Sequence, residues 1–132
     1  MSDKNNTELA QRIDAIESGY EFMLAYAAQG RATDKGAGQG RDVRQFLENM
    51  DAALDGLGPV CLASARTKDG EKADAYKAFL DAVEEDARTA QGVIRMVLAC
   101  ADISSQLVDN MNTNVHLRAL LTDLFVIDDA LK

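Results

Sequence analysis

Pairs of carboxylates three residues apart are the feature of this sequence that could support metal chemistry. Glu48 with Asp51, and Asp81 with Glu84, have this spacing, which places both side chains of a pair on one face of a helix. Two such pairs on facing helices could hold Mg²⁺ for nucleotide hydrolysis. Acidic pairs are also common on the solvated faces of acidic helices. A metal-dependent nucleotide hydrolase is therefore the alternative to a non-enzymatic function.

A glycine-rich segment, residues 31–44, carries a local excess of positive charge in an otherwise acidic chain. Its cations are Arg31, Lys35, Arg41 and Arg44. No GKS or GKT follows its glycines, and their spacing is not GxGxxG, so a nucleotide-binding phosphate loop is excluded. Two interpretations stay open. The segment is a flexible connection between helices, or its cations and the free amides of the next helix bind a carboxylate or phosphate.

The other residues with reactive side chains point to little chemistry. The single histidine, His116, excludes the usual zinc, haem and di-iron sites of helical bundles, and we expect it at the surface near the start of the last helix. Cys61 and Cys100 form neither a CxxC motif nor a disulfide framework. Cys100 borders an apolar stretch, which predicts a buried, inert thiol. No cofactor is expected.

Composition narrows the possible partners. The formal net charge is -8 and the isoelectric point is near 4.5, so the surface repels nucleic acid and anionic lipid. The polar N-terminal segment does not resemble a signal peptide, and no run of 18 apolar residues predicts a membrane span. We expect a cytoplasmic protein with neither nucleic acid nor membrane as a partner. Few aromatic residues, one proline and no tryptophan favour helices over strands.

The glycines and the proline divide the chain into helical segments. Seven of the nine glycines and the only proline lie between residues 30 and 70, where they interrupt helical patterns. We predict helices over residues 7–29 and 42–57, a long helix from residue 71, and a last helix after residues 112–114. Asn6 or Thr7 would cap the first helix, and Asn112, Thr113 or Asn114 the last. Pro59 could open a short extra turn.

A heptad pattern predicts that the third helix is unusually long. Apolar or small residues recur at steps of four and three through about five heptads, which is typical of a seam that faces another helix. About 40 residues would give a helix near 60 Å long. Such a helix either kinks, near Gly92 or at Ser104 and Ser105, or stays straight beneath a second subunit. We expect a straight helix and a homodimer. The pattern comprises Tyr76, Leu80, Val83, Ala87, Ala90, Ile94, Val97, Ala101, Ser104, Val108 and Met111.

Together these patterns predict one all-α domain over residues 1–132, a four-helix, mainly antiparallel bundle with a long third helix. The leading functional hypothesis is a non-enzymatic interaction module: an adaptor, assembly factor or regulatory subunit that binds another protein. Surplus apolar residues at Phe22, Tyr26 and Phe125 are the candidate contacts. A third hypothesis is a ligand-sensing bundle that holds a small molecule between core residues. Those residues would be Tyr20, Met23 and Tyr76.

Overall fold

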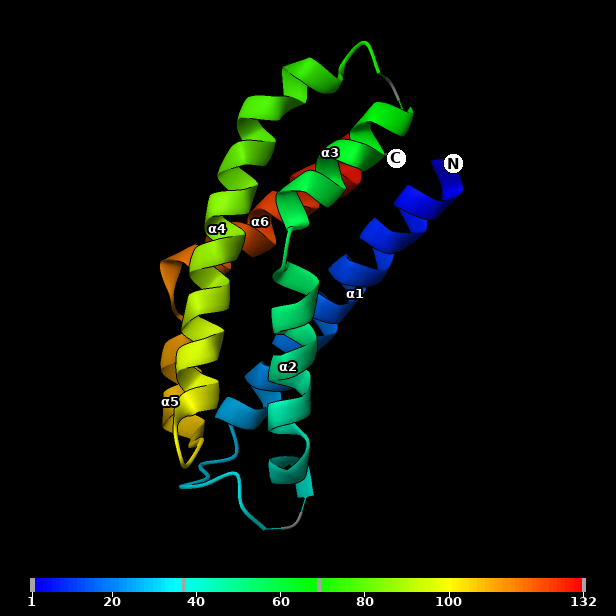
Figure 1. Cartoon of the computed structure of the whole chain (residues 1–132). Coiled ribbons are helices and arrows are strands. Elements are labelled where there is room, and N and C mark those ends of the chain that lie inside the picture. The colour runs from blue at the N-terminus through cyan, green and yellow to red at the C-terminus, as the bar shows by residue number, and fades with distance from the viewer. Residues whose placement is uncertain (1, 37, 69, 132) are drawn as a thin grey trace.

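The protein is all-α, as the composition predicts. The computed structural model describes residues 2–36, 38–68 and 70–131, with side chains from Thr7 onward, and within these residues there is no strand. Six α-helices and a short 3-10 turn, η1, follow one another along the chain (Figure 1). Their bounds are α1 Ser2–Ala27, η1 Gly38–Arg41, α2 Val43–Leu54, α3 Leu57–Lys68, α4 Ala73–Ala99, α5 Ser105–Asn112 and α6 Val115–Ala130.

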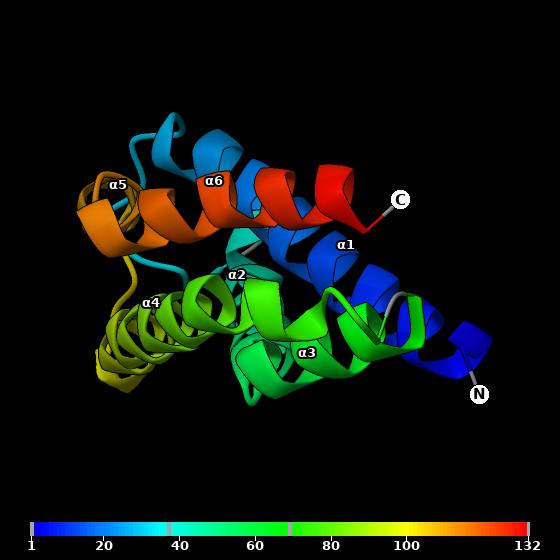
Figure 2. The same ribbon diagram turned by 90° about the horizontal axis from the view of Figure 1, so that it is seen from above.

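The two long helices, α1 and α4, organise the other four. The shorter helices α2 and α3 follow each other in the chain, and each packs against both α1 and α4. The chain then reverses after α4, so that α5 lies beside α4 and α1 (Figure 1). Helix α6 crosses α4 and makes most of its contacts there (Figure 2). The fold is therefore not the four-helix bundle that the sequence predicts.

The helix predicted over residues 42–57 ends early, and a second helix follows it. Helix α2 ends at Leu54, and Asp55 and Gly56 leave the helical conformation before α3 begins at Leu57. Gly56 has a φ of +68°, which glycine adopts without the steric cost that a Cβ would impose. Pro59 lies in the first turn of α3, where its missing N–H would have no helical partner. The short turn predicted at Pro59 is in fact a twelve-residue helix.

The long third helix was predicted wrongly. Helix α4 has 27 residues, about 40 Å at 1.5 Å per residue, and ends at Ala99. Gly92 lies inside it without a break. The chain leaves the helix at Cys100 and enters α5 after Ser104, whose side chain accepts a hydrogen bond from the Leu107 amide at 3.0 Å. The break therefore falls beside Ser104 and Ser105, and the chain folds back without a second subunit.

The heptad residues do form the buried seam of α4. Every seam position from Leu80 to Val97 is buried, and Tyr76 is half-buried at its start. The pattern fails only in the connection to α5, where Ala101 is exposed and Ile103 is completely buried instead. The seam packs against helices of the same chain, so its burial does not depend on a homodimer.

Of the two helix caps predicted from the sequence, one at α1 and one at α6, the structure has the cap at α6. The Asn114 side chain caps α6, accepting hydrogen bonds from the amides of His116 and Leu117 at 3.0 and 3.2 Å. His116 is exposed in the first turn of α6, which confirms its predicted position. Helix α1, by contrast, begins at Ser2 and extends through both predicted cap residues, Asn6 and Thr7.

Two glycine substitutions test the close approach of α3 to α4. A Cβ at Gly58 would lie 2.5 Å from the Glu84 Cβ and 3.1 Å from the Leu80 carbonyl oxygen, whereas a Cβ at Gly92 would meet nothing within 4 Å. We expect Gly58→Ala to lower the free energy of unfolding by about 1–3 kcal/mol. Gly92→Ala should raise it by about 1 kcal/mol, because Gly is a poor helix former.

Urea unfolding followed by circular dichroism measures both free energies. If Gly58→Ala proved as stabilising as Gly92→Ala, then α3 and α4 would not approach each other as closely as this structure has them.

Candidate functional site

The basic segment folds over the C-terminal end of α4 (Figure 1). The Arg44 guanidinium donates hydrogen bonds to the carbonyl oxygens of Leu98 and Cys100 at 2.9 and 2.8 Å, and to that of Ala101 at 3.2 Å. Its Nε donates to the Asp34 carboxylate at 2.8 Å. We call Arg44, Asp34 and the backbone groups of residues 98–103 that they bind the polar clamp. Arg44 satisfies carbonyls that a helix end otherwise leaves without partners.

Asp34 completes the polar clamp from the other side. Its carboxylate accepts a hydrogen bond from the Ile103 amide at 2.8 Å, and its side chain is 8% exposed. Desolvation raises the pKa of Asp34, but the bonds from the Ile103 amide and Arg44 outweigh it, so that this pKa lies below its ordinary value. Tyr26 donates its hydroxyl to the Ile103 carbonyl at 2.6 Å. Both polar backbone groups of the buried Ile103 are therefore satisfied.

A second set of bonds ties the same segment to the start of α5. The Arg31 amide donates to the Ser105 hydroxyl oxygen, and the Ser105 amide donates to the Arg31 carbonyl, each at 2.8 Å. The Ser105 hydroxyl in turn donates to the Tyr26 carbonyl at 2.7 Å. Lys35 pairs with Asp102 at 2.9 Å. These bonds hold residues 31–35 against the junction of α4 and α5, while a flexible connection through the glycines that follow stays a prediction.

The four cations predicted to bind an anion thus have different roles. Arg44 and Lys35 bind the carbonyls at the end of α4, the negative end of the helix dipole. Arg31 donates to the carbonyls of its own loop and lies 5.9 Å from the centre of the Tyr26 ring. Arg41 is exposed at the end of η1, as Lys35 is in the preceding loop. The negative group that this segment binds is mainly the protein's own backbone.

The four carboxylates of the hydrolase hypothesis do not converge. Asp51 pairs with Arg95 at 3.1 Å, Asp81 with Lys77 at 3.0 Å, and Glu84 with Arg88 at 3.1 Å. Glu48 is exposed on α2. Across residues 2–36, 38–68 and 70–131, no three His, Cys, Asp or Glu side chains are grouped so as to hold a metal ion. Asp81 and Glu84 thus form i, i+4 ion pairs within α4, and Asp51 forms one between α2 and α4.

A different pair of acids meets where α6 crosses α4. Asp123 has one buried carboxylate oxygen, Oδ2, without a hydrogen-bond donor among the described residues. Burial, followed by the neighbouring Asp86 carboxylate, raises the pKa of Asp123 to about 7. His116 Nδ1 lies 4.0 Å from Asp86 Oδ1. Residues 86 and 123 are far apart in the sequence, so no local pattern predicts that they form a pair.

The buried, inert thiol predicted at Cys100 is found at Cys61 instead. Cys61 is completely buried, and burial raises its pKa to about 12, which leaves the thiol protonated and unreactive. Cys100 is half-buried, at the residue where the chain leaves α4.

The aromatic residues predicted to contact a partner divide between core and surface. Tyr26 has no exposed surface, and Phe22 is half-buried against Phe46 with ring centres 4.1 Å apart. These two belong to the core of the fold, so a partner cannot reach Tyr26. Phe125 is 61% exposed on α6. The residues of the ligand-sensing hypothesis are also separated: Met23 is buried in the core, whereas Tyr20 and Tyr76 line different hollows.

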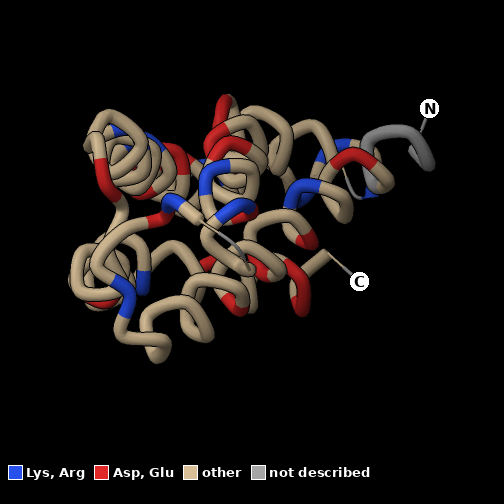
Figure 3. Tube along the Cα trace, turned by 90° about the horizontal axis from the view of Figure 1, so that it is seen from below, with Lys and Arg blue, Asp and Glu red and all other residues tan. Residues whose placement is uncertain are grey.

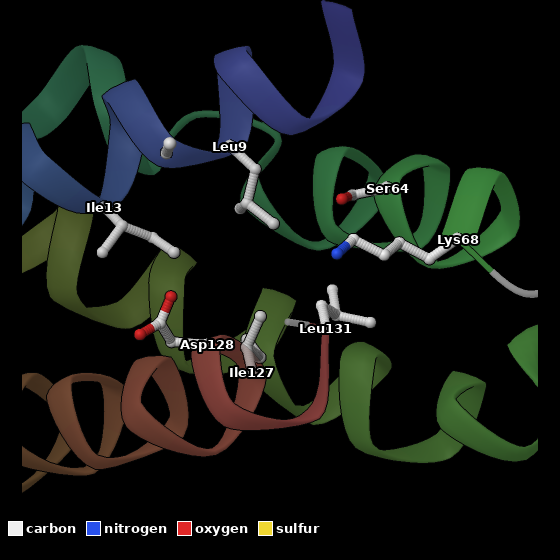
Figure 4. A pocket seen from close by; sticks show the side chains of 8 residues that line it. Leu9, Ile13, Ser64, Lys68, Ile127, Asp128 and Leu131 are labelled. Atoms are coloured by element: carbon white, nitrogen blue, oxygen red, sulfur yellow. The ribbon is translucent and has the colours of Figure 1, made fainter. Parts of the chain in front are cut away.

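Two separate hollows lie along the line where α6 passes α1, since α6 packs mainly on α4. One hollow of about 130 Å³ lies where Leu9 and Ile13 of α1 approach Ile127 and Leu131 (Figure 4). A second, of about 370 Å³, has Tyr20 and Phe125 in its lining. We call these two hollows together the α1/α6 crevice. Its lining comprises Leu9, Ala10, Ile13, Glu17, Tyr20, Glu21, Ser64, Lys68, Arg118, Leu121, Thr122, Phe125, Ile127, Asp128 and Leu131.

A third hollow lies on the other flank of α6. It has a volume of about 260 Å³ and an almost wholly apolar lining from α3, α4 and α6, including Tyr76, Phe79 and Val126. Val126 is 51% exposed and adjoins Phe125 in the sequence. Helix α6 therefore presents an apolar ridge with a hollow on each side.

No protein-family model, curated protein or solved structure matches this chain. Among the helices of the described residues, none combines the length and the apolar character needed to cross a membrane. The candidate site is accordingly defined by geometry, as the exposed ridge of α6 and the hollows beside it.

Removing Arg44 tests the polar clamp. We expect Arg44→Met to lower the free energy of unfolding by about 2–3 kcal/mol, because it removes the guanidinium that pairs with Asp34 and binds the carbonyls of Leu98 and Cys100. Arg41→Met removes the same charge from an exposed position in the same segment and should change stability by less than about 0.5 kcal/mol. Urea unfolding measures both, and equal losses would contradict the structural role of Arg44.

The acid pair predicts an unusual pH dependence. Folded Asp123 keeps its proton up to about pH 7, whereas an unfolded aspartate loses it near pH 4. The folded state binds more protons between these values, so stability falls as pH rises from about 4 to 7. We expect Asp123→Asn to remove this decline in stability. At pH 8 it should stabilise the protein by about 1 kcal/mol, because solvent screens part of the repulsion between the two carboxylates.

Thermal unfolding at several pH values measures this effect. Glu85→Gln, which removes an exposed carboxylate of α4, is the matched control and should retain the decline. An Asp123→Asn variant with an unchanged pH profile would show that Asp123 does not hold the proton.

Proposed function

We propose that this chain is a non-enzymatic protein-interaction module, acting as an adaptor, assembly factor or regulatory subunit in the cytoplasm. The observation that carries the proposal is the apolar ridge of α6. Phe125 and Val126 are 61% and 51% exposed, and each borders a hollow. Large apolar side chains grouped beside hollows are typical of surfaces that another protein covers.

Other exposed apolar residues lack this setting. Leu24, Met96 and Val115 are exposed on three different helices, and none of them lines one of the three hollows described above. Isolated exposure of this kind is ordinary in soluble proteins. The ridge differs because its two residues are adjacent and α6 anchors them from beneath. Leu120 and Leu124, on its opposite face, are buried in the core.

A homodimer is the alternative use of the same ridge. The sequence predicts a dimer because a long heptad seam would otherwise be uncovered, but helices of the same chain cover that seam. A symmetric contact through α6 would also bring together two chains that each carry a net charge of -8. A different protein is therefore the preferred partner. The same net charge disfavours nucleic acid.

A matched pair of surface variants tests the proposal. Phe125→Ser and Leu24→Ser each remove an exposed apolar side chain, so both should keep the wild-type melting temperature within a few degrees. With the purified chain as bait in a lysate of its source organism, we expect a protein that wild type and Leu24→Ser retain and Phe125→Ser loses. Native mass spectrometry of the same samples shows whether the bound mass is a second copy. Equal loss from both variants would contradict a specific role for α6.

A further inference from the structure

We propose that the α1/α6 crevice binds the apolar face of a basic amphipathic helix supplied by the partner protein. This inference rests on the proposed function and names the class of partner. Three properties of the crevice support it, namely its length, its apolar lining and the charge of the two helices that form it.

The two hollows of the crevice lie in line along one face of α1. The first is lined by residues 9–13 of α1 and 127–131 of α6, and the second by residues 17–21 of α1 and 118–125 of α6. The two helices thus run in opposite directions past each other. Residues 9–21 of a helix extend about 18 Å. A partner helix of about twelve residues would therefore span both hollows.

The lining offers apolar positions for side chains from one face of such a helix. Leu9 and Leu131 lie in the first hollow, and Tyr20, Leu121 and Phe125 in the second. An amphipathic helix presents apolar side chains at i, i+3, i+4 and i+7, which places them in successive hollows along a groove. Phe125, at the exposed edge, would pack against the side of the bound helix.

The two helices that form the crevice are strongly acidic. Residues 7–21 of α1 together with α6 contain seven acidic residues and two arginines. Arg12 and Asp123 face other helices: Arg12 donates to the carbonyl oxygens of Ala53 and Asp55, and Asp123 lies beside Asp86 of α4. Glu17 and Glu21 are exposed in the lining of the second hollow. Red segments also predominate around the C-terminal end of α6 (Figure 3).

This charge decides between possible occupants. Lysine and arginine on the polar face of a bound helix would meet Glu17 and Glu21, whereas an acidic helix would be repelled. A second copy of this chain would bring another acidic surface to the crevice. The first hollow holds one acidic and one basic residue, Asp128 and Lys68. In the second hollow Arg118 faces two glutamates, so the acidic excess lies there.

Two labelled peptides test the proposal with the full-length chain. One is a fourteen-residue Leu/Lys amphipathic helix, and the other has glutamate in place of every lysine. We expect the Lys peptide to bind, as fluorescence anisotropy reports, with an affinity that falls as salt rises. The Glu peptide should not bind. Glu17→Gln with Glu21→Gln should weaken binding by about fivefold, and Phe125→Ser by about tenfold or more.

The control removes the same charge elsewhere. Glu48→Gln with Glu85→Gln neutralises two exposed glutamates outside the crevice, and it should weaken binding by less than about twofold. If this control lost as much affinity as the crevice variant, binding would reflect net charge and the proposal would be overturned. Binding of the Lys peptide that is unaffected by Phe125→Ser would overturn it as well. Wild-type melting temperatures show that each variant is folded.

Competition separates this inference from the proposed function. A partner captured through Phe125 that the Lys peptide displaces supports both. A captured partner that the Lys peptide does not displace keeps the interaction module and overturns the basic helix. A dimer of this chain that Phe125→Ser dissociates also overturns the basic helix, in favour of a second copy. The absence of any Phe125-dependent partner contradicts the proposed function itself.

Discussion

The backbone at the end of α4 imposes the constraint on which the rest of the structure depends. A helix that ends inside a protein leaves its last carbonyls without partners, and a buried unpaired carbonyl costs about 1–3 kcal/mol. Arg44 binds the carbonyl of Leu98 in the last turn and those of Cys100 and Ala101 just after it, and Asp34 and Tyr26 bind the polar groups of Ile103. These bonds make a reversal after Ala99 stable. Because the chain reverses there, α5 and α6 lie on helices of their own chain instead of extending from it.

The same reversal explains why the candidate site lies at α6. Helix α6 is packed mainly on α4, and its two flanks are hollows instead of close helix contacts. Part of its contact with α4 is the acid pair of Asp86 and Asp123. Burial and the Asp86 carboxylate raise the pKa of Asp123, and its Oδ2 has no hydrogen-bond donor among the described residues. The helix that offers the apolar ridge is thus held less fully than α2 or α3, each of which packs against two long helices.

The sequence was informative where the determining interactions are local. The heptad spacing predicted the buried face of α4. The sequence also predicted a cap of α6 among residues 112–114, because the bonds of the actual cap, Asn114, reach only two and three residues ahead. The break at residues 100–104 was not predictable in this way. Its bonds come from Tyr26, Asp34 and Arg44, and nothing in the local spacing of the seam changes there. An uninterrupted register fits both a straight helix and a broken one.

The burial of the candidate site residues also depends on contacts that are not local in the sequence. An apolar pattern does not distinguish a side chain that completes a core from one that remains outside it, so Phe22, Tyr26 and Phe125 looked equivalent. The structure places only Phe125 at the exposed ridge. The positive charge of the segment from Arg31 to Arg44 was visible in the sequence. Its cations mainly bind backbone carbonyls, and a sequence does not show which carbonyls lack a helical partner. Glu17 and Glu21 were missed because the crevice needs α1 and α6 together.

The bonds around the α4–α5 junction also determine how this part of the molecule opens. They join residues between 54 and 79 positions apart in the chain, so the first of them to form bears the entropy cost of closing a long loop, and the others then form at little additional cost. Contacts that share one closure form and break as a cooperative unit. The amides of Ile103 and Ser105 are bound to different residues of the same segment. They therefore become accessible to solvent together, in a single opening that separates this segment from the α4–α5 junction.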